Sequence, residues 1–102
     1  MDTLQTIKVS AWVMDDLESR ILMDIRSEMP NLIIETQPFT DKARIVKVKV
    51  NAEGLRVLHN ECRITAQNWS GEYLSDKSDS EARREYLIWS RAEAKLALLL
   101  AQ

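Results

Sequence analysis

Cysteine and long apolar runs are scarce in this sequence. Cys62 is the only cysteine among 102 residues, so no disulfide forms within the chain. No apolar leader follows Met1, and both features predict a protein of the reducing cytoplasm. The longest apolar run, 96–101, is far shorter than the roughly 20 residues that cross a membrane. The sequence therefore predicts no membrane partner.

Glycine and proline are also rare, with two of each, which leaves little chain for flexible linkers. The hydrophobic content of 45% and the charged content of 29% are those of a globular protein. The formal net charge of −2 does not draw the chain to nucleic acid or anionic lipid. We expect one domain over residues 1–102, with a β-α-β-β-α unit over 1–71, a connector over 72–77 and a C-terminal helix over 78–102.

Residues 6–13 alternate between apolar and polar side chains, which predicts a strand with one buried face. Its outer face holds Lys8, Ser10 and Trp12. Asp15 and Asp16 are suited to begin a helix that ends before Pro30. The buried side of this helix is predicted from apolar residues at four-residue spacing, which are Leu17, Ile21, Ile25 and Met29, with Leu22 beside them.

Two further strands are predicted over 31–37 and 43–50, joined by a five-residue turn that contains a proline and an aspartate. In the second of these strands the valines face inward, and the outward residues are Ile45, Lys47 and Lys49. Asn51 is suited to cap a helix over 52–69, and Gly71 is suited to end it. The apolar side of that helix consists of Leu55, Leu58, Cys62, Ala66 and Trp69.

The last helix is predicted to begin at Ser78, from the Ser-x-x-Glu pattern over 78–81. The order β-α-β-β-α-α indicates an α+β fold. Connection rules favour a three-stranded, mainly antiparallel sheet with the third strand in the centre, in a truncated ferredoxin-like arrangement with an extra C-terminal helix. The fourth strand of that layout, which would flank the first strand, has no counterpart in the pattern. The first strand is therefore expected at an open sheet edge.

His59 and Cys62 lie three residues apart on a predicted helix and could begin a metal site or a thiol–base pair. A structural zinc site needs four ligands, and the sequence has no other cysteine or histidine, so a buried cysteine is the simpler interpretation. The carboxylates within 15–16 and 76–81 lie at predicted helix starts, where capping explains them. Without a phosphate-binding loop or a nucleophile motif, we expect no catalytic site, no metal and no cofactor.

The outer face of the predicted sheet is basic and supports a first functional hypothesis. Its cations, with one aromatic residue, suit a surface that stacks bases and neutralises phosphates. The residues are Lys8, Trp12, Arg44, Lys47 and Lys49. Alternating lysines also protect a solvated sheet from aggregation, so both interpretations stay open.

The last helix has more apolar surface than one core contact requires. Its broad face holds Ile88, Trp89, Ala92, Leu96, Leu99 and Leu100. A narrower stripe on nearly the opposite side holds Leu87, Ala94 and Leu98, flanked by Arg83, Arg84 and Arg91. The stripe is either packed within the domain or an interface for a partner, and arginine is favoured at interfaces.

These features favour a small, non-catalytic cytoplasmic protein that acts by protein–protein contact, as a regulator or inhibitor of a larger machine. Compact chains without catalytic motifs are common among phage- and plasmid-encoded proteins that act on a host. Two alternatives stay open, namely a nucleic-acid-binding module that uses the basic face and a self-assembling accessory domain such as a homodimer. The sequence does not identify the partner.

Overall fold

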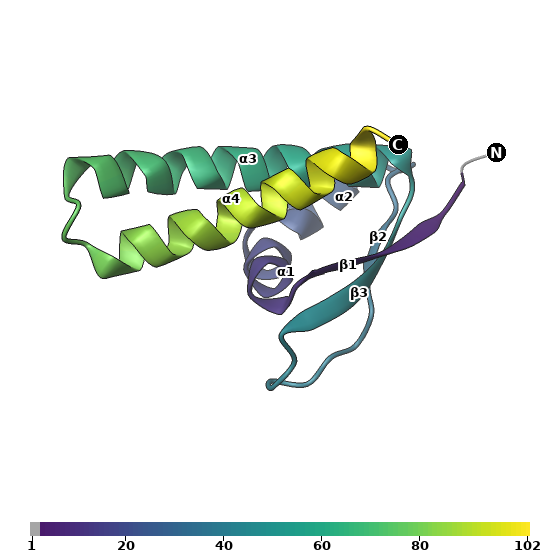
Figure 1. The fold of residues 1–102 in the computed structure, drawn as a ribbon. Coiled ribbons are helices and arrows are strands. Elements are labelled where there is room, and N and C mark those ends of the chain that lie inside the picture. The colour runs from purple at the N-terminus through teal and green to yellow at the C-terminus, as the bar shows by residue number, and fades with distance from the viewer. Residues whose placement is uncertain (1–2) are drawn as a thin grey trace. The chain divides into compact units, whose positions relative to one another are not determined.

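Figure 1 shows a computed structural model of the chain, in which residues 3–102 are described. The first elements are β1 (Gln5–Ser10), α1 (Ala11–Leu17), the π-helical turn η1 (Glu18–Leu22), α2 (Met23–Glu28), β2 (Ile34–Thr36) and β3 (Ile45–Val50). The long helices α3 (Ala52–Ser75) and α4 (Ser80–Leu100) follow. The predicted α+β element order is therefore confirmed. The chain divides into two compact units, Met1–Leu55 and Arg56–Gln102.

The three strands of the first unit form one antiparallel sheet in the order β1-β3-β2, which confirms the predicted central position of the third strand. Side chains alternate across the sheet, as the sequence pattern predicts. The inward residues are buried, and they are Ile7, Val9, Ile34, Val46, Val48 and Val50. Helix α1 packs on this sheet at β1 and β3 (Figure 1).

The first strand is shorter than predicted, because β1 ends at Ser10. The Ser10 hydroxyl accepts a hydrogen bond from the backbone N–H of Val13 (3.5 Å) and caps α1. The prediction that Asp15 and Asp16 begin the helix is therefore wrong. Serine is as good a cap as aspartate, and it precedes them in the chain.

Trp12 lies in the first turn of α1, so its predicted place on the outer sheet face is wrong. The alternation of apolar and polar residues over 6–13 does not distinguish a strand from the start of a helix at the end of this segment. Val13, Met14 and Leu17 are all fully buried, and their spacing is that of one helix face. Residues 11–13 fit both the alternation of a strand and the spacing of a helix face, and in the structure they are helical.

The π-helical turn changes which side chains of the first helical segment are buried. Leu17 and Leu22 are five residues apart and both fully buried. Ile21, Ile25 and Met29, which were predicted to continue the buried side, are only half-buried. A π-helical turn holds one more residue than an α-helical turn, and this shifts the apolar face by one position.

Asn51 caps α3 as predicted, since its Oδ1 accepts a hydrogen bond from the backbone N–H of Gly54 (2.8 Å). The same oxygen accepts from the N–H of Ile33 (3.2 Å), and the Asn51 amide donates to the carbonyl of Asn31 (2.8 Å). One buried side chain therefore joins the start of α3 to the segment that leads into β2.

Helix α3 passes through Gly71 and ends at Ser75, so the predicted stop at Gly71 is wrong and much of the predicted connector, 72–77, is helical. Gly71 does not adopt a positive φ, the conformation for which a helix-ending glycine is selected. The added turn brings Tyr73 onto Tyr86 of α4, with ring centroids 6.3 Å apart in a stacked arrangement. This aromatic contact favours the longer helix.

Helix α4 is capped by Asp79, whose side chain accepts from the backbone N–H of Ala82 (3.0 Å). The predicted capping box that starts at Ser78 is therefore wrong by one residue. Ser78 is bound by the side chain of Asp76 instead, through its N–H (3.0 Å) and its hydroxyl (2.6 Å). These hydrogen bonds hold the pKa of the Asp76 carboxyl below its ordinary value.

In the second unit α3 and α4 pack together side by side (Figure 1). The buried residues of this unit are Leu58, Cys62, Thr65, Ala66, Ala82, Glu85, Trp89 and Leu96. The Trp89 indole N–H donates to Glu85 Oε2 (3.1 Å), which gives the buried carboxylate a partner. Among residues 3–102, no helix combines the length and apolar character needed to cross a membrane.

Candidate functional site

Among residues 3–102, β1 pairs with β3 alone and forms one edge of the sheet. The N–H of Gln37 donates to the carbonyl of Lys47 (2.9 Å), so the backbone groups of Lys47 point towards the β2 side of β3. Lys8 is the register partner of Lys47 on the other side. The N–H and C=O groups of Lys8, and of Thr6 two residues earlier, therefore point away from β3. A further strand could pair with them.

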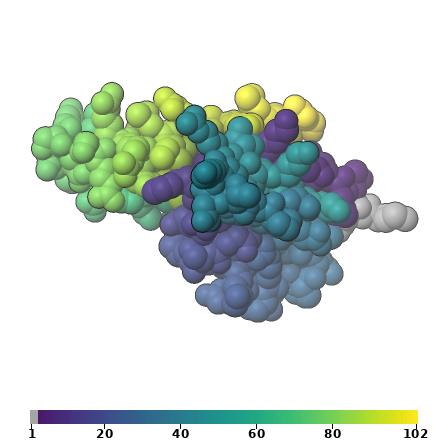
Figure 2. All heavy atoms as spheres, turned by 90° about the horizontal axis from the view of Figure 1, so that it is seen from below, coloured from purple at the N-terminus to yellow at the C-terminus, as the bar shows by residue number. Residues whose placement is uncertain are grey.

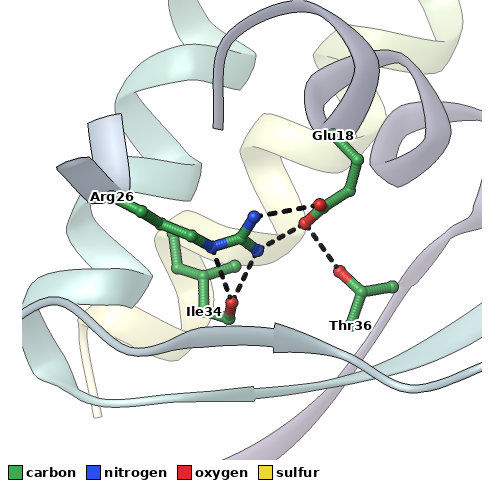
Figure 3. A network of polar contacts seen from close by, with 4 residues as sticks. All are labelled: Glu18, Arg26, Ile34 and Thr36. Atoms are coloured by element: carbon green, nitrogen blue, oxygen red, sulfur yellow. Dashed lines mark hydrogen bonds and ion pairs between the residues drawn. The ribbon is translucent and has the colours of Figure 1, made fainter. Parts of the chain in front are cut away.

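At the opposite edge, a side chain binds the outward carbonyl of Ile34 in β2 (Figure 3). Arg26 donates to the carbonyl of Ile34 from Nε (3.2 Å) and Nη2 (2.6 Å). The same guanidinium binds both carboxylate oxygens of Glu18, with 3.0 Å between Nη1 and Oε2. The Thr36 hydroxyl donates to Glu18 Oε1 (3.1 Å). In the part of the chain that the structure describes, a side chain therefore binds an outward carbonyl at the β2 edge, whereas no strand pairs with the outer side of β1.

Acidification is expected to weaken the closure of the β2 edge. The hydrogen bond from Arg26 lowers the pKa of Glu18 below its ordinary value against the opposing effect of burial, and the charge of Arg26 and the bond from Thr36 add to the lowering. The stability that this pair contributes is present above the unfolded-state pKa of about 4.3 and is lost as the pH falls through the lower folded-state pKa.

We expect Glu18→Gln to reduce the free energy of unfolding at pH 7 by about 1 kcal/mol, because the pair is partly exposed. At pH 3 the difference from the wild type should be smaller. Urea denaturation at both pH values measures this, with Asp24→Asn as an exposed carboxylate control. An equal loss for Glu18→Gln at both pH values contradicts the assigned role.

Three of the five residues considered for nucleic-acid binding share the outer sheet face. Lys8 and Lys47 are direct cross-strand partners, and Lys49 lies between Thr6 of β1 and Glu35 of β2 in register. Arg44 is exposed and directly precedes β3, whereas Trp12 lies in α1. The three strands carry no aromatic residue, so this face has cations but no ring on which a base could stack.

The predicted partner-binding stripe of α4 is exposed over part of its length. Leu98 is 70% exposed, whereas Leu87 is half-buried. The other exposed members are Arg83, Arg84, Arg91 and Ala94. One exposed leucine next to an alanine is a small apolar surface, which many monomeric proteins also present.

Cys62 and His59 do not form a reactive pair. Burial raises the pKa of the Cys62 thiol to about 12, and the charges of Glu61 and Glu93 act in the same direction. The thiol is therefore protonated at neutral pH and is a poor nucleophile. His59 lies beside Glu93, with 3.7 Å between His59 Nε2 and Glu93 Oε1. Within the described chain, no group of three potential ligands could hold a metal ion.

Sequence reasoning missed two features of the first unit. Arg26 was not assigned a role, because the Ile34 carbonyl that it covers is identified only by the strand register. The second feature is a hollow beside Trp12 that Phe39 also lines. An aromatic residue in a short turn that is otherwise polar was a signal for such a feature.

Comparison with models of protein families, with curated proteins and with solved structures found no match.

Proposed function

We propose that this protein binds a partner protein by pairing a strand of that partner with the free edge of β1. What supports the proposal is the difference between the two edges of the sheet. Arg26 covers the carbonyl of Ile34 at the β2 edge. At the β1 edge the N–H and C=O groups of Thr6 and Lys8 are directed outward, as the strand register requires. Strand addition is a common mode of peptide recognition, in which the backbone hydrogen bonds supply affinity.

The charge of the outer face favours an acidic partner strand. Lys8 and Lys47 lie directly opposite each other, and like charges in such a pair repel. A glutamate on the added strand, opposite Lys8, would relieve this repulsion. Pairing of two copies through β1 would instead place two sets of lysines on the same face of one continuous sheet. We therefore commit to a different, acidic protein rather than a second copy of this chain.

The finer fold assignment, a truncated ferredoxin-like arrangement, belongs to the same proposal. The strand order β1-β3-β2, with helices between β1 and β2, supports it. In that layout a fourth strand would pair with β1. Residues 3–102 contain three strands, so the partner would supply the strand that this chain lacks.

A non-catalytic regulator or inhibitor of a larger cytoplasmic machine is the biological role that we propose for such binding. Occupying a strand of the machine is a direct way to block a contact that the strand makes elsewhere. The α4 stripe around Leu98 is an alternative surface for a protein partner, with less support because its exposed apolar area is small.

Thr6→Pro tests the role of the β1 edge. Proline removes the outward N–H of Thr6 and places its ring in the path of a new strand, whereas the ladder to β3 does not use that N–H. The probe is an acetylated nine-residue peptide that alternates glutamate and valine. Its binding is measured by fluorescence anisotropy. We expect the variant to bind at least roughly tenfold more weakly, the equivalent of about 1.4 kcal/mol.

Thr6→Val is the matched control, because it keeps the N–H and should bind as the wild type does. A peptide with N-methylated glutamates should not bind, and a lysine–valine peptide should bind more weakly. Thermal melts establish that each variant is folded. Unchanged binding by folded Thr6→Pro contradicts the proposal. Loss of binding in Leu98→Glu but not in Thr6→Pro would place the interface on α4 instead.

Nucleic-acid binding is the second candidate function, and the shared face of Lys8, Lys47 and Lys49 is the observation that favours it. Binding of single-stranded RNA should then weaken steeply with salt and be lost in Lys47→Glu. An RNA affinity that is insensitive to both changes rules this candidate out. The absence of aromatic residues from the strands makes it the weaker of the two.

A further inference from the structure

A hollow of about 260 Å³ lies where β1 passes into α1, next to the β2–β3 loop. In the space-filling view the teal atoms of that loop lie beside the violet atoms of α1 (Figure 2). The lining residues are Ala11, Trp12, Asp15, Phe39, Asp41 and Ala43. All of them belong to the first unit of the chain.

Local hydrogen bonds hold the walls of the hollow together. The N–H of Ala11, at the start of α1, donates to the carbonyl of Arg44 at the end of the loop (2.9 Å). The N–H of Ala43 donates to the carbonyl of Thr40 (3.0 Å), which closes a turn within the loop. The two alanines leave space between the walls because their side chains are single methyl groups.

Two aromatic side chains border this hollow and are partly exposed to solvent. Trp12 is 54% exposed and Phe39 is 41% exposed. Asp15 and Asp41 also line the hollow, and its described lining includes no lysine or arginine. Aromatic faces and carboxylates together attract one class of group, an organic cation.

We propose that this hollow binds an arginine side chain of a partner protein. Its volume is below the roughly 300–1,000 Å³ of pockets for small molecules, and it suits a single side chain. A guanidinium is planar, so it can stack on Trp12 or Phe39 while its N–H groups donate to Asp15 or Asp41. Arginine forms such contacts with aromatic rings more often than lysine does. The site does not depend on strand addition at β1.

The experiment follows the Trp12 indole N–H in two-dimensional ¹H–¹⁵N NMR spectra, with Trp12→Phe used to assign the signal. The probe is the peptide acetyl-Gly-Arg-Gly-amide at millimolar concentration. The matched control replaces arginine with citrulline, which has the same shape and no charge. We expect the arginine peptide to shift the Trp12 signal, the lysine peptide to do so more weakly and the citrulline peptide to have no effect.

The double variant Asp15→Asn with Asp41→Asn should bind the arginine peptide at least roughly fivefold more weakly, because the charges are removed while the rings stay. Asp24→Asn, an exposed carboxylate on α2, should have no effect. The dispersion of the spectra shows whether each variant is folded. An unmoved Trp12 signal, or an equal shift with the citrulline peptide, overturns the proposal. Thr6→Pro should leave this binding unchanged, so a failure here and a failure of the β1 interface are distinguishable.

Discussion

Gly54→Ala is expected to destabilise the protein by about 3 kcal/mol or more, a large share of the 5–15 kcal/mol that is typical of a domain. A Cβ atom at Gly54 would lie 2.1 Å from the carbonyl oxygen of Ile33 and 3.1 Å from its carbonyl carbon. Both atoms are backbone, so the clash cannot be relieved by a change of rotamer. The segment before β2 would have to move away from the start of α3.

Gly71→Ala is the matched control, because Gly71 lies in the same helix and a Cβ there would meet nothing within 4 Å. Alanine is favoured over glycine in a helix by about 1 kcal/mol, so this variant should be more stable than the wild type. Thermal and urea denaturation of both variants should therefore give shifts of opposite sign.

Helix propensity alone predicts that both substitutions stabilise the protein. If Gly54→Ala also raises the melting temperature, the start of α3 does not lie against Ile33 as described. Since about 1 kcal/mol shifts the melting temperature of a domain of this size by roughly 4–8 °C, the two outcomes are easily separated.

The sheet was predictable because its sequence pattern is local and clear. Val46, Val48 and Val50 alternate with two lysines, and the turn after Gln37 fixes β2 as the hairpin neighbour of β3. The handedness of the crossover then places β3 in the centre. The basic outer face follows from the same alternation, which is why Lys8, Lys47 and Lys49 were placed together correctly.

The two helix starts that were predicted wrongly each have two residues nearby that are suitable as N-caps. Ser10 and Asp15 are both good caps, and Ser78 and Asp79 are both good caps one residue apart. For α1, the bond between the Ala11 N–H and the carbonyl of Arg44 in the β2–β3 loop favours the earlier start. For α4, the side chain of Asp76 binds Ser78, and Asp79 caps the helix. Once the start of α1 was misplaced, the position of Trp12 was wrong as well.

The edge closure and the hollow are beyond sequence reasoning for a different reason. Arg26 reaches Ile34 eight residues away across a change of element, and Phe39 joins Trp12 from a loop more than twenty residues later. Neither pair of residues has a sequence separation that is typical of a known motif. Such pairs can be recognised only when the register of the strands and the orientation of the helix faces are both known.

Asn51→Ala is expected to reduce the free energy of unfolding by about 2–4 kcal/mol, because a lost helix cap and unpaired buried backbone groups both contribute. Asn51 is 2% exposed. Its side chain accepts from the N–H groups of Ile33 and Gly54 and donates to the carbonyl of Asn31. Alanine would leave these three backbone groups without this partner, in a place that water reaches poorly.

Two matched variants separate the cap of α3 from the link to β2. Asn51→Asp keeps the oxygen that accepts from Ile33 and Gly54 but loses the donor to Asn31, so we expect a loss smaller than that of Asn51→Ala. Asn31→Ala keeps the Asn31 carbonyl and should be within about 0.5 kcal/mol of the wild type. Urea denaturation measures all three. A loss below about 0.5 kcal/mol for Asn51→Ala would show that the junction between β2 and α3 does not depend on this side chain.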